Sequence, residues 1–166
     1  MAGGGAPRAA AGSLLRFRGD APTASNVALG KPTRASSVLY PDNYAARATD
    51  GKFDSIFHSD TEAKPYLVVD LGAAFSIESV RVMPRLDFNS SRFMGVEVRT
   101  GLTQVQGPDF TSYTRLALFP GPAYLPTTWF TQNLTQPVAG RYVSVQRTAE
   151  PGGLLEITEL EVFARQ

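Results

Sequence analysis

The 166 residues include no cysteine. Disulfide bonds, thiolate metal sites and a cysteine nucleophile are therefore excluded, and stability has to come from packing, with or without help from a metal ion. There is also only one histidine, His58, and no Gly-x-Ser-x-Gly elbow, P-loop or His-Glu-x-x-His motif occurs. With so few groups able to act as nucleophile or base, the sequence predicts a binding module and not an enzyme.

Charge of one sign is lacking as well, because 16 Lys and Arg residues face 15 Asp and Glu residues. Binding to nucleic acid or to an anionic membrane generally depends on a strong positive field, so neither partner is expected. Apolar runs are short, and none approaches the roughly 20 residues that cross a bilayer as a helix.

The length suits one domain with a buried core. Residues 1–25 are rich in Ala, Gly and Arg and predict a flexible tail or linker, with the domain over 26–166. The tail lacks the apolar core of a secretory signal, because Arg16 follows directly after Leu15. A transit peptide, a linker and a native arm all remain open for it.

From Asn26 onward, short runs of β-branched and aromatic residues alternate with clusters of Gly, Pro, Asn and Asp. Period-two alternation, as in Met94, Val96 and Val98, is typical of half-buried strands, and no window shows sustained helical periodicity. Seven runs at this spacing predict an all-β sandwich or barrel. The predicted strands are Tyr66–Leu71, Ile77–Met83, Phe93–Arg99, Tyr113–Phe119, Thr128–Leu134, Arg141–Arg147 and Ile157–Phe163.

Four segments of the chain resemble one known family. They are Asn26–Thr33, Ala48–Gly51 with Phe57–Ser59, Pro65–Gly72 and the closing run Glu156–Phe163. Together they resemble the discoidin domains (coagulation factor 5/8 type C) and the related F-type fucose lectins, over Asn26 to about Ala164. The resemblance implies a galactose-binding-domain-like jelly-roll β-sandwich whose loops bind ligand at one end.

A spaced motif sharpens the resemblance. F-type lectins carry a His, 26 residues, Arg-x-Asp, four residues and a final Arg or Lys. Here His58, Arg85, Asp87 and Arg92 stand at these four positions, a match expected by chance on the order of once in 1,000. Galactose-binding discoidin modules have similar residues at similar sites, so L-fucose and galactose-type terminal sugars both remain open.

Fucose and galactose share an acceptor-rich edge with an axial hydroxyl, which suits several converging donors. His58, Arg85 and Arg92 would supply the donors, because charge-assisted hydrogen bonds are about twice as strong as neutral ones. Asp87 would orient an arginine. The alternative interpretation is an exposed ladder of ion pairs at a sheet edge, with His58 in a surface loop.

An aromatic surface would carry the apolar face of the sugar. Phe57, Phe88 and Tyr40 are the candidates. Phe88-Asn89 stands where many F-type lectins have adjacent cysteines that pack against the sugar, and this departure leaves the specificity open.

The resemblance also implies a structural calcium ion. Calcium takes six to eight oxygens, which loops rich in carbonyl groups supply. The alternative is that Asp50 only caps a turn before Gly51. The positions that match the family's ligands are Asp50 and Glu159 by side chain, and Arg47, Lys52, Ser55 and Thr158 by backbone or hydroxyl oxygen.

Two functions follow as hypotheses. The first is a calcium-stabilised lectin, extracellular or at the cell surface, whose partners are fucosylated or galactosylated glycans. The second is an intracellular scaffold subunit of a large assembly with a vestigial sugar site and protein partners, cytoplasmic or ciliary if Met1 is the native start. The sequons at Asn89 and Asn133 favour a secreted protein, although a glycan on Asn89 would block the proposed pocket.

Overall fold

The structure is a computed structural model that describes residues 23–87, 91–124 and 129–165. Strands dominate it, as the alternating pattern predicts, and η1 (Ala45–Thr49) is a short 3-10 segment. The elements are β1 (Ser25–Asn26), β2 (Thr33–Ala35), η1 (Ala45–Thr49), β3 (Phe57–His58), β4 (Tyr66–Pro84), β5 (Val96–Gly101), β6 (Thr114–Phe119), β7 (Phe130–Arg147) and β8 (Glu156–Arg165).

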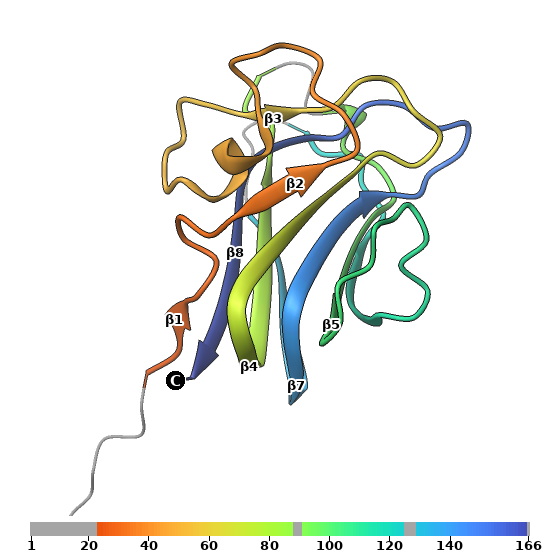
Figure 1. Ribbon diagram of the computed structural model, residues 1–166. Helices are drawn as coiled ribbons and strands as arrows, with labels where there is room; N and C mark the ends of the chain where they lie inside the picture. Colours follow the sequence, from red (N-terminus) through yellow and green to blue (C-terminus); the bar gives the residue numbers. More distant parts are fainter. Residues whose placement is uncertain (1–22, 88–90, 125–128, 166) are drawn as a thin grey trace, which may run out of the picture.

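Strands β4 and β7 are long and bent, and they pair with each other through both layers of an antiparallel sandwich (Figure 1). Their register shifts between Asp70 and Phe75. Before the shift β4 also pairs with β2, and after it with β8. The sequence predicts two separate strands in the region of β4 and two in the region of β7. Each of these pairs forms one continuous strand, because the backbone pairing continues around the bend.

Gly140 lies at the bend of β7. A Cβ atom on this residue would lie 1.9 Å from the side-chain oxygen of Thr100 on β5. Thr100 is buried and donates a hydrogen bond of 3.0 Å to the carbonyl of Tyr142. Glycine is therefore needed at this position because the neighbouring strand comes too close for any side chain.

The main core lies between the two layers. Val96 and Val98 are fully buried, as the alternation predicts, whereas Met94 is 40% exposed because it precedes β5 in a loop. Strands β4, β7 and β8 contribute further buried aliphatic residues to this core, namely Leu67, Val69, Val80, Val82, Val143, Val145, Leu160 and Val162.

The loops around β3 gather at one end of the sandwich, the upper end in Figure 1. At the opposite end, Ser25 pairs with Ala164, so the last residue of the predicted tail belongs to the sheet. The rest of that tail, residues 1–22, lies outside the described residues. Within the described part, no helix has the length and apolar character needed to span a membrane.

Phe57 and Phe53 provide a matched test of the core. Phe57 is 0% exposed and Phe53 is 54% exposed. We expect Phe57→Ala to lower the free energy of unfolding by about 3–5 kcal/mol, since it leaves a cavity in the main core. Phe53→Ala should lower it by less than about 1 kcal/mol. Urea unfolding monitored by fluorescence measures both, and equal losses would contradict this view of the core.

Candidate functional site

The sheet pairing brings three distant segments together at the loop end. His58 on β3 is the direct cross-strand neighbour of Glu156, the first residue of β8. Arg85 follows Pro84, which pairs with Ile157 on the same strand. Residues that are far apart in the sequence, His58, Arg85 and Glu156, are therefore brought together because their segments all meet at β8.

Glu156 is the common partner of the three predicted donors. Its Oε1 lies 2.8 Å from His58 Nε2, 2.7 Å from Arg85 Nη1 and 3.3 Å from Arg92 Nη1. Its side chain is only 4% exposed, and its second oxygen, Oε2, is buried with no hydrogen-bond partner among the described residues. The carboxylate thus holds all three donors on a single oxygen.

His58 is fully engaged within the protein. Its Nδ1 lies 2.8 Å from the carbonyl oxygen of Ser59, and its Nε2 faces Glu156. Both ring nitrogens therefore face oxygen atoms of the protein. In this arrangement His58 has no nitrogen left for a ligand and acts on the site through Glu156.

Arg85 and Arg92 are the donors that reach solvent. The side chain of Arg92 is 45% exposed and that of Arg85 is 24% exposed. Arg85 Nε also donates to Asp87 Oδ2 at 2.7 Å, which is the orienting contact expected for Asp87. Burial acts to lower the pKa of Arg85, but the hydrogen bonds to Asp87 and Glu156 outweigh it and raise that pKa, so the guanidinium keeps its charge.

The structure corrects one of the aromatic candidates. Phe57 is completely buried in the core and presents no surface to a sugar, because its strand turns it away from the loop end. Phe88 lies outside the described residues, as does Asn89. Tyr40 is 57% exposed, and its ring meets that of His58 edge to face at a centroid distance of 5.7 Å. Tyr40 is therefore the exposed aromatic ring beside the donors.

Two grooves are each lined by one of the arginines that bind Glu156. One of about 360 Å³ is lined by Arg85 and Asp87 together with Asn43, Phe53 and Leu86. The other, of about 440 Å³, is lined by Arg92 and Arg147 together with Thr61, Met94 and Leu154. Arg85 and Arg92 share the Glu156 carboxylate, so each groove has in its lining one arginine of the same cluster.

Sequence reasoning missed Glu156. A carboxylate at the start of a closing strand has no distinctive spacing from His58 or Arg85, and only the pairing of β3 with β8 shows that they meet. One signal was present, since Glu156 opens the closing run that carries the family resemblance. Without the strand register, nothing distinguished it from Glu159 and Glu161.

The predicted calcium ligands lie at the contact of η1 and the following loop with β8. The backbone N–H of Gly51 donates to both oxygens of Glu159 at 3.2 Å. The pKa of Glu159 is raised to about 8, chiefly by burial; the Gly51 hydrogen bond opposes the shift, and the charges of Asp50 and Glu161 add to it. No basic side chain of the described residues is paired with this buried acid, which fits a cation site.

The other predicted ligands are found around Asp50 or on β8. Lys52 N and Ser55 Oγ donate to the two Asp50 oxygens at 2.9 and 3.2 Å, and Arg47 Nη1 lies 3.6 Å from Oδ2. Thr158 Oγ1 donates to the Pro84 carbonyl at 2.8 Å. Within 23–87, 91–124 and 129–165, no three His, Asp or Glu side chains cluster as a metal site, so most ligands would be carbonyl and hydroxyl oxygens.

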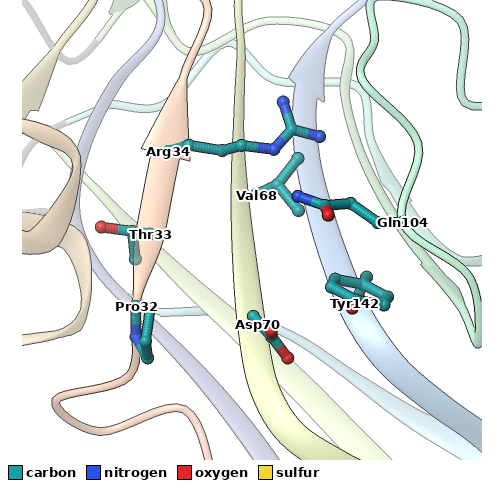
Figure 2. Close-up of a pocket in the computed structure, with 7 residues that line it drawn as sticks. All are labelled: Pro32, Thr33, Arg34, Val68, Asp70, Gln104 and Tyr142. Atoms are coloured by element: carbon teal, nitrogen blue, oxygen red, sulfur yellow. The ribbon is translucent and has the colours of Figure 1, made fainter.

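A smaller cavity of about 170 Å³ lies on the outer face of β2, β4 and β7, away from the Glu156 cluster (Figure 2). It is lined by Arg34, Val68, Asp70 and Tyr142, among others. Asp70 is held there by a bidentate ion pair with Arg141 at 2.8 and 3.0 Å, and the hydrogen bonds of this pair lower the pKa of Asp70. Arg34 donates to the carbonyl oxygens of Val105 and Gln106, but its Nε is buried without a hydrogen-bond partner among the described residues.

An antiparallel sandwich with a polar cluster at its loop end defines the class of protein, and comparison with known proteins gives the family. The profile of the F5/8 type C domain matches residues 32–160. The chain belongs to this family. A comparison with curated protein sequences found no match.

Several solved structures share the fold. A fucolectin from striped bass (Morone saxatilis) serum is 25% identical, with a TM-score of 0.76 over 85% of this chain and 49% of its own. This chain thus spans about half the length of that lectin. The lectin domain of lectinolysin, complexed with Lewis B antigen, is 25% identical, with a TM-score of 0.69 over 86% of this chain and 98% of its own. A family 32 carbohydrate-binding module of C. perfringens NanJ, complexed with galactose, is 21% identical, with a TM-score of 0.68 over 86% and 99%.

The raised pKa of Glu159 predicts how stability depends on pH without calcium. Between the ordinary pKa of about 4.5 and the folded value of about 8, the unfolded chain has lost a proton that the folded chain keeps. Raising the pH through this window therefore destabilises the protein, by up to about tenfold per pH unit in the unfolding equilibrium. Glu159→Gln should remove this loss, measured by urea unfolding from pH 5 to pH 9 in chelator.

Glu150→Gln is the control, because Glu150 is exposed. It should leave the pH dependence of the wild-type protein in place. A wild-type slope that survives in Glu159→Gln would show that Glu159 is not the group responsible.

Proposed function

We propose that this chain is a non-catalytic carbohydrate-binding module that recognises terminal L-fucose or galactose-type sugars. One observation carries the proposal: His58, Arg85 and Arg92, the donors of the F-type motif, converge on one point at the loop end of the sandwich. Family membership and the lectin structures of the same fold support it. Glycans outside the cell or on its surface are the partners that such a module would meet.

The exposed sides of the two arginines would contact the sugar. Each guanidinium has one Nη on Glu156, which leaves further N–H groups for ring and hydroxyl oxygens. Tyr40, exposed beside His58, would receive the apolar face of the sugar. Glu156 and Asp87 hold the guanidinium groups in place, so less side-chain freedom is lost when a ligand binds.

A shallow site of this kind binds a single sugar weakly. We expect a dissociation constant between about 10 μM and about 1 mM, which corresponds to roughly 4–7 kcal/mol. Higher avidity would require several copies of the domain in one molecule or assembly.

The variant Glu156→Gln tests whether the carboxylate positions the donors. Replacing a charged acceptor by a neutral amide roughly halves the strength of the three hydrogen bonds at Oε1. We expect affinity for methyl α-L-fucoside or methyl β-D-galactoside, whichever binds the wild-type protein, to fall about tenfold. NMR titration measures the affinity of both proteins, with Glu150→Gln as the control.

Tighter sugar binding by Glu156→Gln would contradict this role. It would mean that the carboxylate competes with the sugar for the same donors. Unchanged binding would show that the arginines do not depend on Glu156 for their positions.

A second candidate function is a protein-binding scaffold with an unused sugar site. The same cluster favours it, because Glu156 already satisfies the three donors and His58 is buried. A folded wild-type protein that shows no NMR shifts with either sugar at tens of millimolar would reject the lectin and select the scaffold.

We also propose that calcium binds between Asp50 and Glu159. The support is chemical: a buried acidic side chain lies beside a second carboxylate in a loop rich in carbonyl groups. Arg47, Lys52, Ser55 and Thr158 would add backbone or hydroxyl oxygens. A bound cation would neutralise the two acids and tie the loop to β8.

Thermal unfolding with and without calcium tests this second proposal. Millimolar calcium should raise the melting temperature of the wild-type protein at pH 7.5. At 100 times the dissociation constant, calcium binding would add about 2.7 kcal/mol to the free energy of unfolding. Asp50→Asn should abolish most of this rise because it removes a charged ligand. Asp109→Asn, in a loop of the opposite sheet, should keep it, and an equal rise in Asp50→Asn would reject the site.

A further inference from the structure

The groove lined by Arg92 also contains Arg147, a positive charge that has no part in the proposed monosaccharide site. Arg147, the last residue of β7, lies beneath the groove and is 8% exposed. Its Nη1 donates to the carbonyl oxygens of Arg92 and Met94 at 3.1 and 3.2 Å, and its Nη2 to that of Gly152 at 2.7 Å. These bonds hold the two sides of the groove together, but all three acceptors are neutral.

No carboxylate of the described residues pairs with Arg147. Its Nε is buried and has no hydrogen-bond partner there. The acid Glu62, whose backbone pairs with Gly153, has its Oε1 engaged by hydrogen bonds from Ser36 and Ser37. A buried ion normally has a compensating partner of opposite charge, so the positive charge beneath this groove is uncompensated.

The lining of the groove adds exposed cationic and apolar surface. Arg92 carries a second positive charge, shared with Glu156, and its side chain is 45% exposed. Met94 is 40% exposed and Leu154 is half-buried. None of the residues that line the groove is acidic. A sugar ring could place its apolar face on Met94 and Leu154 while an attached group reaches Arg92.

We propose that this groove is a subsite for an acidic substituent on another sugar of a bound oligosaccharide. The inference rests on the proposed function, because Arg92 belongs to both sites. Arg92 donates hydrogen bonds to the anion, and Arg147 adds positive potential from below, which is strong in a groove walled by protein. Sulfate and carboxylate share the required chemistry.

Three trisaccharides of one skeleton test the subsite: Lewis a, its 3′-sulfated form and its 3′-sialylated form, with methyl α-L-fucoside as the monosaccharide. Titration calorimetry at about 50 mM sodium chloride should give about tenfold tighter binding for at least one acidic form than for neutral Lewis a, as one charge-assisted hydrogen bond would produce. At about 500 mM salt, screening should remove most of this difference. Whichever acidic form is preferred identifies sulfate or carboxylate as the group bound.

Two variants with the same charge change locate the effect. Thr61→Glu places a carboxylate at the exposed edge of the groove and should abolish the acidic preference while methyl α-L-fucoside binds as before. Thr114→Glu adds the same charge at the exposed start of β6, where the strand pairs with Thr100 and not with the loop end, and should keep the preference.

Equal affinity for the neutral and acidic trisaccharides overturns the subsite but leaves the fucose or galactose site intact. A preference that persists in Thr61→Glu also overturns it, because the anion would then bind elsewhere. A wild-type protein that binds none of these sugars rejects the proposed function itself, and the subsite with it.

Discussion

The pairing of two bent strands, β4 and β7, is the constraint on which the rest of the structure depends. Each strand contributes to both layers, so the sandwich is held together by continuous backbone and not only by packing between faces. The bend requires Gly140, where the side chain of Thr100 occupies the space that a Cβ atom would need. Because the second half of β4 pairs with β8, this bend also determines the position of β8 in the sheet.

Strand β8 links the fold to the candidate sites. Glu156 at its start binds the three donors of the motif, and Glu159, three residues later, receives the N–H of Gly51. Both are buried acids, but their surroundings differ. Glu156 lies among His58 and two arginines, whereas Glu159 has Asp50 and Glu161 as its charged neighbours. One strand therefore supplies a compensated carboxylate to the donor cluster and an uncompensated one to the loop around Asp50.

Within the donor cluster, the three donors differ in how far they are committed to the protein. Three charge-assisted hydrogen bonds on one buried oxygen make the arrangement rigid before any ligand arrives. His58 is committed to Ser59 and Glu156, so the arginines, with their several N–H groups, are the donors that remain for solvent and ligand. In the proposed function, specificity would depend on what lies beside Arg85 and Arg92, where the two grooves differ in charge.

Period-two alternation was enough to predict an all-β chain and part of its core, because burial of every second residue is a local property of a strand facing a core. The positions of Val96 and Val98 illustrate this success, and Met94 marks its limit, since the strand begins only after it. Phe57 shows a different limit. An aromatic residue next to the motif's histidine was expected at the surface, but which of two adjacent residues faces the core depends on the sheet to which the strand pairs.

The sequence by itself determined the fold class, the family resemblance and the spacing of His58, Arg85, Asp87 and Arg92, all of which are encoded in local pattern and residue type. Only the tertiary structure decided that β4 and β7 are continuous, that Glu156 is the shared acceptor and that Arg147 lies without a carboxylate partner beneath a groove. The physical reason is that these features arise from strand register. Pairing between segments up to about 100 residues apart is set by the packing of the whole sandwich, not by any local run of residues.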